Sequence, residues 1–285
     1  MQPEPGQPDS AGTLDYPYRL VALDLDDTLL GRDLVFTPRV RRAVQAAMDA
    51  GLMVTLATGR MFRSALPLAR ELGITLPIIC YQGALIKDPL SMEVLFHRPV
   101  PLENARQIIQ MARNWGLHVN VYVDDELYVA RVTPEAESYV RIAQVPVHPV
   151  GDLLEFLKSP PTKVVIVSDE ATIDKVMVDL RTVFGETLYV TKSLPMFCEI
   201  AHPGCNKGTA LAFLAAHLGV SREETVAVGD GLNDLEMVQW AGLGIAMGNA
   251  PQQLRDAAGW VTGPLQEDGA AQALERILEG VLSPT

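Results

Sequence analysis

Short apolar runs alternate with segments of helical periodicity along much of the chain. Residues 20–23 are apolar throughout, as expected for a parallel strand buried on both faces. Residues 38–48 carry apolar side chains at helical spacing, with Thr37 as N-cap and Gly51 as a stop signal. The same patterns predict strands at 52–57, 77–81, 225–228, 243–247 and 260–261, and helices near 64–72, 207–218, 234–240, after Pro251 and at the C-terminus. This alternation predicts a doubly wound, Rossmann-like α/β domain with a parallel sheet covered on both faces.

The pattern changes from about residue 86 to residue 197. It predicts helices at 102–115 and 169–184, a hairpin of strands 118–123 and 127–130 around a turn at 124–126, and strands at 163–167, 188–191 and 196–200. We therefore predict an α+β cap domain inserted into the wound domain. The predicted bounds are 1–17 for a disordered, Pro-rich tail, 18–85 with 198–285 for the core, and 86–197 for the cap. Linkers near 84–88 and 200–205 should let the cap hinge.

Composition limits the partners of the protein. The chain has 285 residues, enough for about two domains. Its 23 Lys and Arg against 35 Asp and Glu give a net charge of −12, which repels nucleic acid and anionic membranes. The sequence shows neither a membrane-length apolar run nor a secretory signal. Cys80, Cys198 and Cys205 form no Cys-x-x-Cys pair, so we expect a protein of the reducing cytoplasm.

Acidic and hydroxyl side chains follow three strands of the predicted parallel sheet. Asp24 and Asp26 follow the first strand, Thr58 the second, and Asp230 with Asp234 a later one. The carboxyl ends of parallel strands share one edge, so these residues should converge there. Each could instead start a turn or cap a helix, and for Asp234 that alternative stays open. Clustered carboxylates are costly without a cation, so the set points to a hard divalent ion.

Four motifs in order resemble the haloacid dehalogenase superfamily of phosphotransferases. They are Leu23-Asp24-Leu25-Asp26-Asp27-Thr28-Leu29, Ala57-Thr58-Gly59-Arg60, Asn206-Lys207-Gly208 and Gly229-Asp230-Gly231-Leu232-Asn233-Asp234, followed by Ala246-Met247-Gly248-Asn249-Ala250. The insert after the third core strand is similar to that of the Cof-type subfamily. The resemblance covers nearly the whole chain after residue 18 and implies a hydrolase that removes phosphate from small phosphate esters.

The resemblance also implies roles for the motif residues. Asp24 would attack phosphorus and form an aspartyl phosphate, while Asp26 would serve as general acid and then base. Mg²⁺ would be held by the Asp24 side chain, the Asp26 backbone carbonyl and Asp230, with Asp234 acting through water.

The remaining motif residues would hold the phosphoryl group. Thr58, the Gly59 amide and Asn233 would bind its oxygens, and Lys207 would neutralise its charge and that of the nucleophile. Lysines at helix starts are usually solvated, which is the alternative for Lys207. Arg60 could contact substrate or pair with an acid on the adjacent helix.

Two positions depart from the family pattern. Gln82 stands where the subfamily often has Asn, so no contact is carried over to it. Asp27 stands where many relatives have Gly, and we interpret it as a turn residue. The five histidines share no ligand spacing, which argues against a histidine metal site.

Several functional classes remain at this stage. A Mg²⁺-dependent phosphatase leads, with sugar phosphates as the favoured substrates and nucleotide or cofactor phosphates next. A dehalogenase lacks the acid that Asp26 supplies, and residues 31–37 are too short for the cap expected in a phosphomutase. A metabolite-sensing or interaction protein without turnover would normally have a broken motif. We expect the enzyme to be a monomer or a homodimer.

Overall fold

The computed structural model describes residues 17–31, 33–192 and 194–282. The predicted disordered tail, apart from Pro17, lies outside these residues. The core begins with β1 (Leu20–Leu23), α1 (Pro38–Asp49), β2 (Met53–Leu56), α2 (Phe62–Glu71), β3 (Ile78–Cys80), a short 3-10 turn η1 (Tyr81–Gly83), β4 (Leu85–Lys87) and β5 (Val94–His97). It resumes with α7 (Lys207–His217), β12 (Thr225–Gly229), η3 (Leu232–Asp234), α8 (Leu235–Trp240), β13 (Leu243–Ala246), α9 (Gln252–Ala257), β14 (Trp260–Val261), η4 (Leu265–Glu267) and α10 (Gly269–Leu278).

The core sheet has five parallel strands in the order β14-β13-β12-β1-β2. Alternate residues of β1 face opposite layers. Val21 and Leu23 pack with α1 and α10, whereas Leu20 and Ala22 pack with α7 and α8. Burial on both faces explains why this strand is apolar at every position. The predicted doubly wound α/β class is confirmed.

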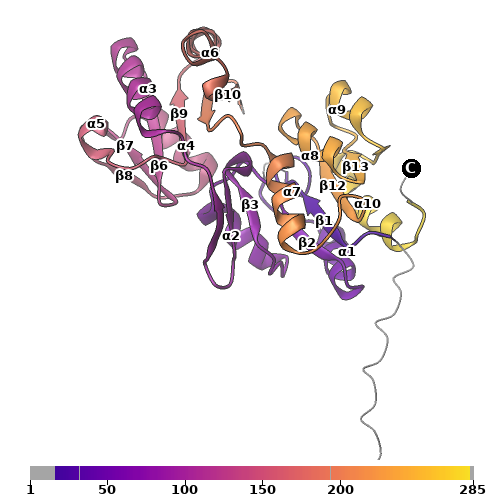
Figure 1. Cartoon of the computed structure of the whole chain (residues 1–285). Coiled ribbons are helices and arrows are strands. Elements are labelled where there is room, and N and C mark those ends of the chain that lie inside the picture. The colour runs from indigo at the N-terminus through magenta and orange to yellow at the C-terminus, as the bar shows by residue number, and fades with distance from the viewer. Residues whose placement is uncertain (1–16, 32, 193, 283–285) are drawn as a thin grey trace, which may run out of the picture.

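The inserted segment forms a second sheet of six strands, in the order β10-β11-β9-β6-β7-β8. Its elements are α3 (Leu102–Trp115), β6 (His118–Val123), β7 (Glu126–Val129), α4 (Pro134–Ala143), β8 (Val147–Pro149), α5 (Leu153–Phe156), β9 (Lys163–Val167), α6 (Glu170–Phe184), η2 (Gly185–Thr187), β10 (Tyr189–Lys192) and β11 (Phe197–Ala201). Figure 1 shows α3, α5 and α6 on the side of the molecule away from α1 and α10. We call residues 102–201 the inserted unit; the division at residues 86 and 197 stays a prediction.

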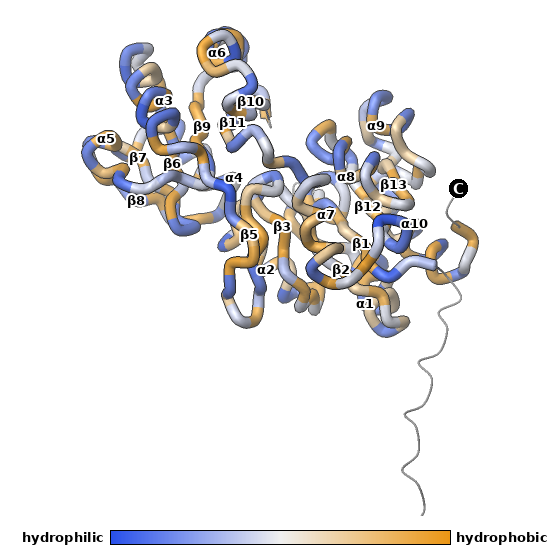
Figure 2. The backbone as a smooth tube through the Cα atoms, in the orientation of Figure 1, coloured by the Kyte–Doolittle hydropathy of each residue, from blue (hydrophilic) through white to orange (hydrophobic). Residues whose placement is uncertain are grey.

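Several elements were not predicted. Residues 131–162 hold α4, β8 and α5, and β4 with β5 joins β3 in a separate three-stranded antiparallel sheet. The β5 segment is strongly hydrophobic in Figure 2, and its Phe96 packs on Phe213 of α7, so it lies on the core. Residues 85–87 of the predicted first linker are hydrogen-bonded strand, and residues 98–101, between β5 and α3, belong to no helix or strand. Arg98 there donates to the Gly204 carbonyl of the second linker.

Helix α2 also differs from its prediction. It begins at Phe62 rather than near Ser64, which leaves Pro67 inside the helix instead of in its first turn. The N-cap residue, Met61, supplies no side-chain hydrogen bond. Instead, Asp125 of the inserted unit accepts a hydrogen bond from the Arg63 amide over 2.7 Å. A partner this distant in sequence gives no local start signal.

Candidate active site

The strand ends bring the predicted residues together at one edge of the core sheet. The Asp24 amide donates to the Val228 carbonyl at the end of β12, and the Ala57 amide donates to the Leu23 carbonyl at the end of β1. Asp24, Asp230 and Asp234 each place a carboxylate oxygen within 4.8 Å of the others. The expected convergence of these three acids is thus observed.

Lys207 lies among these carboxylates. Its ammonium donates to Asp24 Oδ1 and to Asp234 Oδ1, each over 2.6 Å, and its side chain is fully buried. Asn206 caps α7 in a reciprocal pair with Thr209, which fixes the start of the helix and so the position of Lys207. The alternative of a solvated lysine is wrong. A buried lysine is stable here because two carboxylates neutralise it.

Asp234 is fixed by backbone groups as well as by Lys207. Its Oδ2 accepts hydrogen bonds from the amides of Asp230 and Gly231, at 3.0 and 2.9 Å. A Cβ at Gly229 would lie 2.5 Å from the Asp234 Cβ, so only glycine permits this approach. Asp234 does begin a short helix, as the alternative held, but it also orders the turn that carries Asp230.

The charges of the cluster do not cancel. Three carboxylates face one ammonium, and burial raises the pKa of Asp24 well above its usual range, with Asp234 adding to the shift and Lys207 opposing it. Burial and Asp234 also raise the pKa of Asp230 to about 7. This excess negative charge and the all-oxygen donor set fit a divalent cation such as Mg²⁺.

Neighbouring side chains orient Asp230. Thr28 donates its hydroxyl hydrogen to Asp230 Oδ1 over 3.0 Å, and the Asn249 side-chain Nδ2 donates to Asp230 Oδ2 over 3.2 Å. The Asn249 side-chain Nδ2 also donates to the Asp27 carbonyl. Asp27 has a φ of 59°, in the left-handed region, which fits its interpretation as a turn residue. Thr28 and Asn249 had no assigned role; their only signal was membership of the motif strings.

Asp26 lies apart from the acidic cluster, with half of its side chain exposed. Arg60 holds it through two nitrogens, Nη2 at 2.6 Å from Oδ1 and Nε at 2.9 Å from Oδ2. Of the two alternatives left open for Arg60, pairing with an acid on the adjacent helix is not observed; its partner is the motif-one acid Asp26. Such a bidentate pair fixes the direction of the Asp26 carboxylate.

Besides Lys207, the predicted phosphate-binding residues Thr58, Gly59 and Asn233 lie around Gln82. Thr58 is buried, and its Oγ1 accepts from the Arg60 amide over 3.1 Å. The Asn233 side-chain Nδ2 donates to Gln82 Oε1 over 3.1 Å, while a Cβ at Gly59 would lie 2.3 Å from Gln82 Nε2. Gln82, to which no contact had been carried over, thus joins the segments of Gly59 and Asn233.

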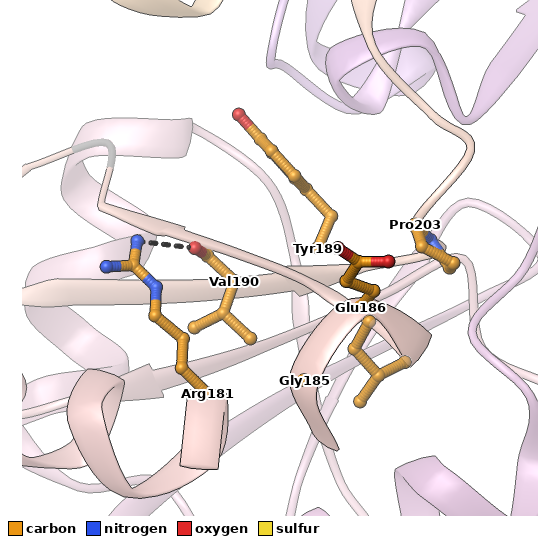
Figure 3. Close-up of a pocket in the computed structure, with 7 residues that line it drawn as sticks. Arg181, Gly185, Glu186, Tyr189, Val190 and Pro203 are labelled. Atoms are coloured by element: carbon orange, nitrogen blue, oxygen red, sulfur yellow. Dashed lines mark hydrogen bonds between the residues drawn. The ribbon is translucent and has the colours of Figure 1, made fainter. Parts of the chain in front are cut away.

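A hollow in the described part of the structure lies away from these residues. This cavity of about 630 Å³ borders η2 and β10 of the inserted unit and Pro203 of the second linker. Figure 3 shows Arg181, Glu186 and Pro203 around it, with the Arg181 guanidinium hydrogen-bonded to the Val190 carbonyl. None of the predicted site residues lines it. We therefore locate the chemistry at the strand ends, where the carboxylates and Lys207 converge.

The chain belongs to the haloacid dehalogenase-like hydrolases, whose family model matches residues 21–274. It is 32% identical over 263 residues to 5-amino-6-(5-phospho-D-ribitylamino)uracil phosphatase YitU of Bacillus subtilis, covering 91% of this chain and 97% of that protein. It is 30% identical over 265 residues to pyridoxal phosphate phosphatase YbhA of Escherichia coli, covering 89% and 96%. A solved haloacid dehalogenase-like hydrolase from Bacteroides thetaiotaomicron superposes with a TM-score of 0.85 at 31% identity, covering 91% and 99%.

These similarities confirm the predicted family, the α/β fold and the enzyme class. The protein is a phosphatase of small phosphorylated metabolites. Within the residues that the structure describes, no helix combines the length and apolar character needed to span a bilayer.

Proposed function

We propose that the protein is a Mg²⁺-dependent phosphatase that works through an aspartyl phosphate on Asp24. The observation that carries this proposal is the position of Lys207, which bridges Asp24 and Asp234 beside Asp230. Bound Mg²⁺ would shield the charge of the phosphoryl oxygens. Asp24, Asp230 and the backbone carbonyl of Asp26 would hold it, with Asp234 acting through water.

The two acids after β1 would divide the reaction. A carboxylate oxygen of Asp24 attacks phosphorus, and the bond to the ester oxygen breaks as Asp26 gives that oxygen a proton. Asp26, now ionised, takes a proton from water as the water oxygen attacks the phosphorus of the aspartyl phosphate. Inorganic phosphate leaves and the Asp24 carboxylate is restored, so two easier displacements replace one hard one.

The remaining residues would position the phosphoryl group. Lys207 holds Asp24 in place and offsets its charge, so the nucleophile can approach an anionic ester. Thr58, the Gly59 amide and Asn233 would donate hydrogen bonds to the phosphoryl oxygens. Their arrangement around Gln82 supports this assignment.

The proposed substrates are small phosphate esters, with sugar phosphates favoured and nucleotide or cofactor phosphates next. The relatives named above act on a phosphoribityl pyrimidine and on pyridoxal phosphate, which shows that substrates vary within the family. We also propose that the enzyme acts in the cytoplasm as a monomer or homodimer. The net charge of −12 and the lack of a Cys-x-x-Cys pair support this setting.

The test is a phosphate-release screen over a panel of metabolites. Turnover should vanish in chelator, return with Mg²⁺, and stay low with Ca²⁺, whose larger and less regular coordination shell would misplace the nucleophile. Asp24→Asn, prepared in parallel, removes contaminating activity from the comparison. Full turnover in excess chelator would contradict the proposal.

A further inference from the structure

The inserted unit docks onto the core through the turn between β6 and β7. Asp125 Oδ1 accepts a hydrogen bond from the Tyr81 hydroxyl over 2.8 Å, and Asp125 Oδ2 accepts from the Arg63 amide over 2.7 Å. The next residue, Glu126, forms an ion pair with the Arg63 guanidinium. One turn of the inserted unit therefore holds both η1 and the start of α2.

Tyr81 and Gln82 adopt an unusual backbone conformation. Their φ angles are 53° and 57°, in the left-handed region that bulky L-residues rarely occupy. Two backbone hydrogen bonds hold the pair, from the Tyr81 amide to the Arg60 carbonyl at 2.9 Å and from the Gln82 amide to the Thr58 carbonyl at 3.1 Å. Strain of this kind persists only where the surroundings fix it.

The inserted unit supplies part of these surroundings. Tyr81 is fully buried, and its ring meets the ring of Tyr122 edge-on with centroids 5.9 Å apart. The Lys163 ammonium lies 5.8 Å from the Tyr81 ring centre and 5.2 Å from that of Tyr122. Residues of the inserted unit thus hold Tyr81 by its ring as well as by its hydroxyl.

The pair also reaches the proposed phosphate site. The backbone amides of Tyr81 and Gln82 donate to the carbonyls of Arg60 and Thr58. The Gln82 side chain fills the space beside Gly59, and its Oε1 accepts a hydrogen bond from the Asn233 side chain. A continuous path of contacts therefore leads from Asp125, through Tyr81 and Gln82, to the loop at the end of β2.

We propose that Asp125 is a positioning residue: by binding Tyr81 and the start of α2, it keeps the inserted unit docked and holds Tyr81 and Gln82 in the conformation that places the Thr58–Arg60 loop. The catalytic part rests on the proposed function; the docking part does not. If Asp125 only joined two surfaces, it would not be connected to the phosphate loop through Tyr81 and Gln82, whose backbone conformation is strained.

Docking is tested by the distance between spin labels on introduced cysteines. Ala46→Cys on α1 and Gln107→Cys on α3 are exposed positions in the core and the inserted unit. The native Cys80, Cys198 and Cys205 are all buried and should not label. In this background Asp125→Asn removes the charge and one acceptor, whereas Asp124→Asn is the matched control, an exposed acid in the same turn with a φ of 52°.

The distance distribution should broaden or lengthen in Asp125→Asn and stay unchanged in Asp124→Asn. Tyr81→Phe removes only the donor to Asp125 and should reproduce the change, which keeps the test decisive if Asp125→Asn folds poorly. Unchanged distributions in both Asp125→Asn and Tyr81→Phe would overturn the docking claim.

The second readout is kcat for a small aryl phosphate, whose leaving group is too small to depend on contacts with the inserted unit. We expect a fall of about tenfold in Asp125→Asn and Tyr81→Phe, comparable with losing one charge-assisted hydrogen bond, and none in Asp124→Asn. A surface contact without a positioning role would weaken only larger esters, so an unchanged aryl phosphate kcat overturns the proposal. If the parent protein has no activity, the proposed function fails, while the distances still decide the docking.

Discussion

Lys207 and Asp24 are 183 residues apart in the chain, yet the Lys207 ammonium lies 2.6 Å from Asp24 Oδ1 in the buried centre of the site. The same ammonium binds Asp234 at an equal distance. Lys207 therefore links the first and fourth motifs, and both the packing of the site and its charge balance depend on it.

Replacing Lys207 by Met should destabilise the metal-free protein by about 3 kcal/mol or more, because it leaves buried carboxylates without their cation. Chemical unfolding in chelator measures the loss, and added Mg²⁺ should restore part of it. The matched control is Arg39→Met, which breaks the half-exposed pair with Glu275 and should cost about 1 kcal/mol or less. Equal losses in the two variants would contradict the role given to Lys207.

The packing of Gly83 against α7 gives a second prediction. A Cβ there would lie 2.3 Å from the Asn206 carbonyl oxygen, whereas a Cβ at Gly116 would meet nothing within 4 Å. Both glycines have positive φ, 96° and 70°, so Ala carries a conformational cost of about 1 kcal/mol at either site. Gly83→Ala should lose about 2 kcal/mol more than Gly116→Ala in chemical unfolding, and most of its phosphatase activity, because Asn206 begins the helix that carries Lys207. Equal losses of stability and of activity in the two variants would contradict the role given to the packing of Gly83 against Asn206.

From the environment of His118 in the inserted unit we expect the stability of the protein to depend on pH. Burial lowers the pKa of His118, and the hydrogen bond with Asn120 opposes that shift. The unfolded chain takes up this proton near its ordinary pKa of about 6.5, while the folded protein resists it, so stability should fall as pH drops below about 6.5. Chemical unfolding at several pH values should show that the free energy of unfolding falls less steeply with decreasing pH in His118→Gln than in the parent. If the free energy of unfolding depended on pH in the same way in both proteins, His118 would not contribute to that dependence.

Much of the fold, including part of the inserted unit, could be predicted from local signals. Helix 102–115 and strands 118–123 and 163–167 have the predicted bounds, because their apolar spacing and the Gly116 stop are contained within the segments themselves. By contrast, α4 and α5 were missed. Both carry local start signals, Thr133 followed by Pro134 for α4 and Asp152 for α5, but these helices are only ten and four residues long and offer little apolar periodicity to read.

Those parts of the candidate site whose positions follow from the parallel strand order alone could be predicted from the sequence. Strand ends bring Asp24 and Asp230 together in any sheet of this order, so their convergence followed from the alternation of elements. The partner of Arg60 and the place of Gln82 depend on side-chain directions and on a left-handed backbone, which spacing does not encode. The roles of the site residues in turnover stay predictions.

The most direct test of the central claim is the site of covalent phosphorylation. Enzyme mixed with an activated aryl phosphate and Mg²⁺ is quenched in acid and mapped by peptide mass spectrometry. In Asp26→Asn, which slows hydrolysis of the intermediate while an activated leaving group needs little protonation, phosphate should accumulate on the peptide that contains Asp24. Asp24→Asn should carry none. Phosphate on Asp24→Asn, or on another residue of Asp26→Asn, would contradict Asp24 as the nucleophile.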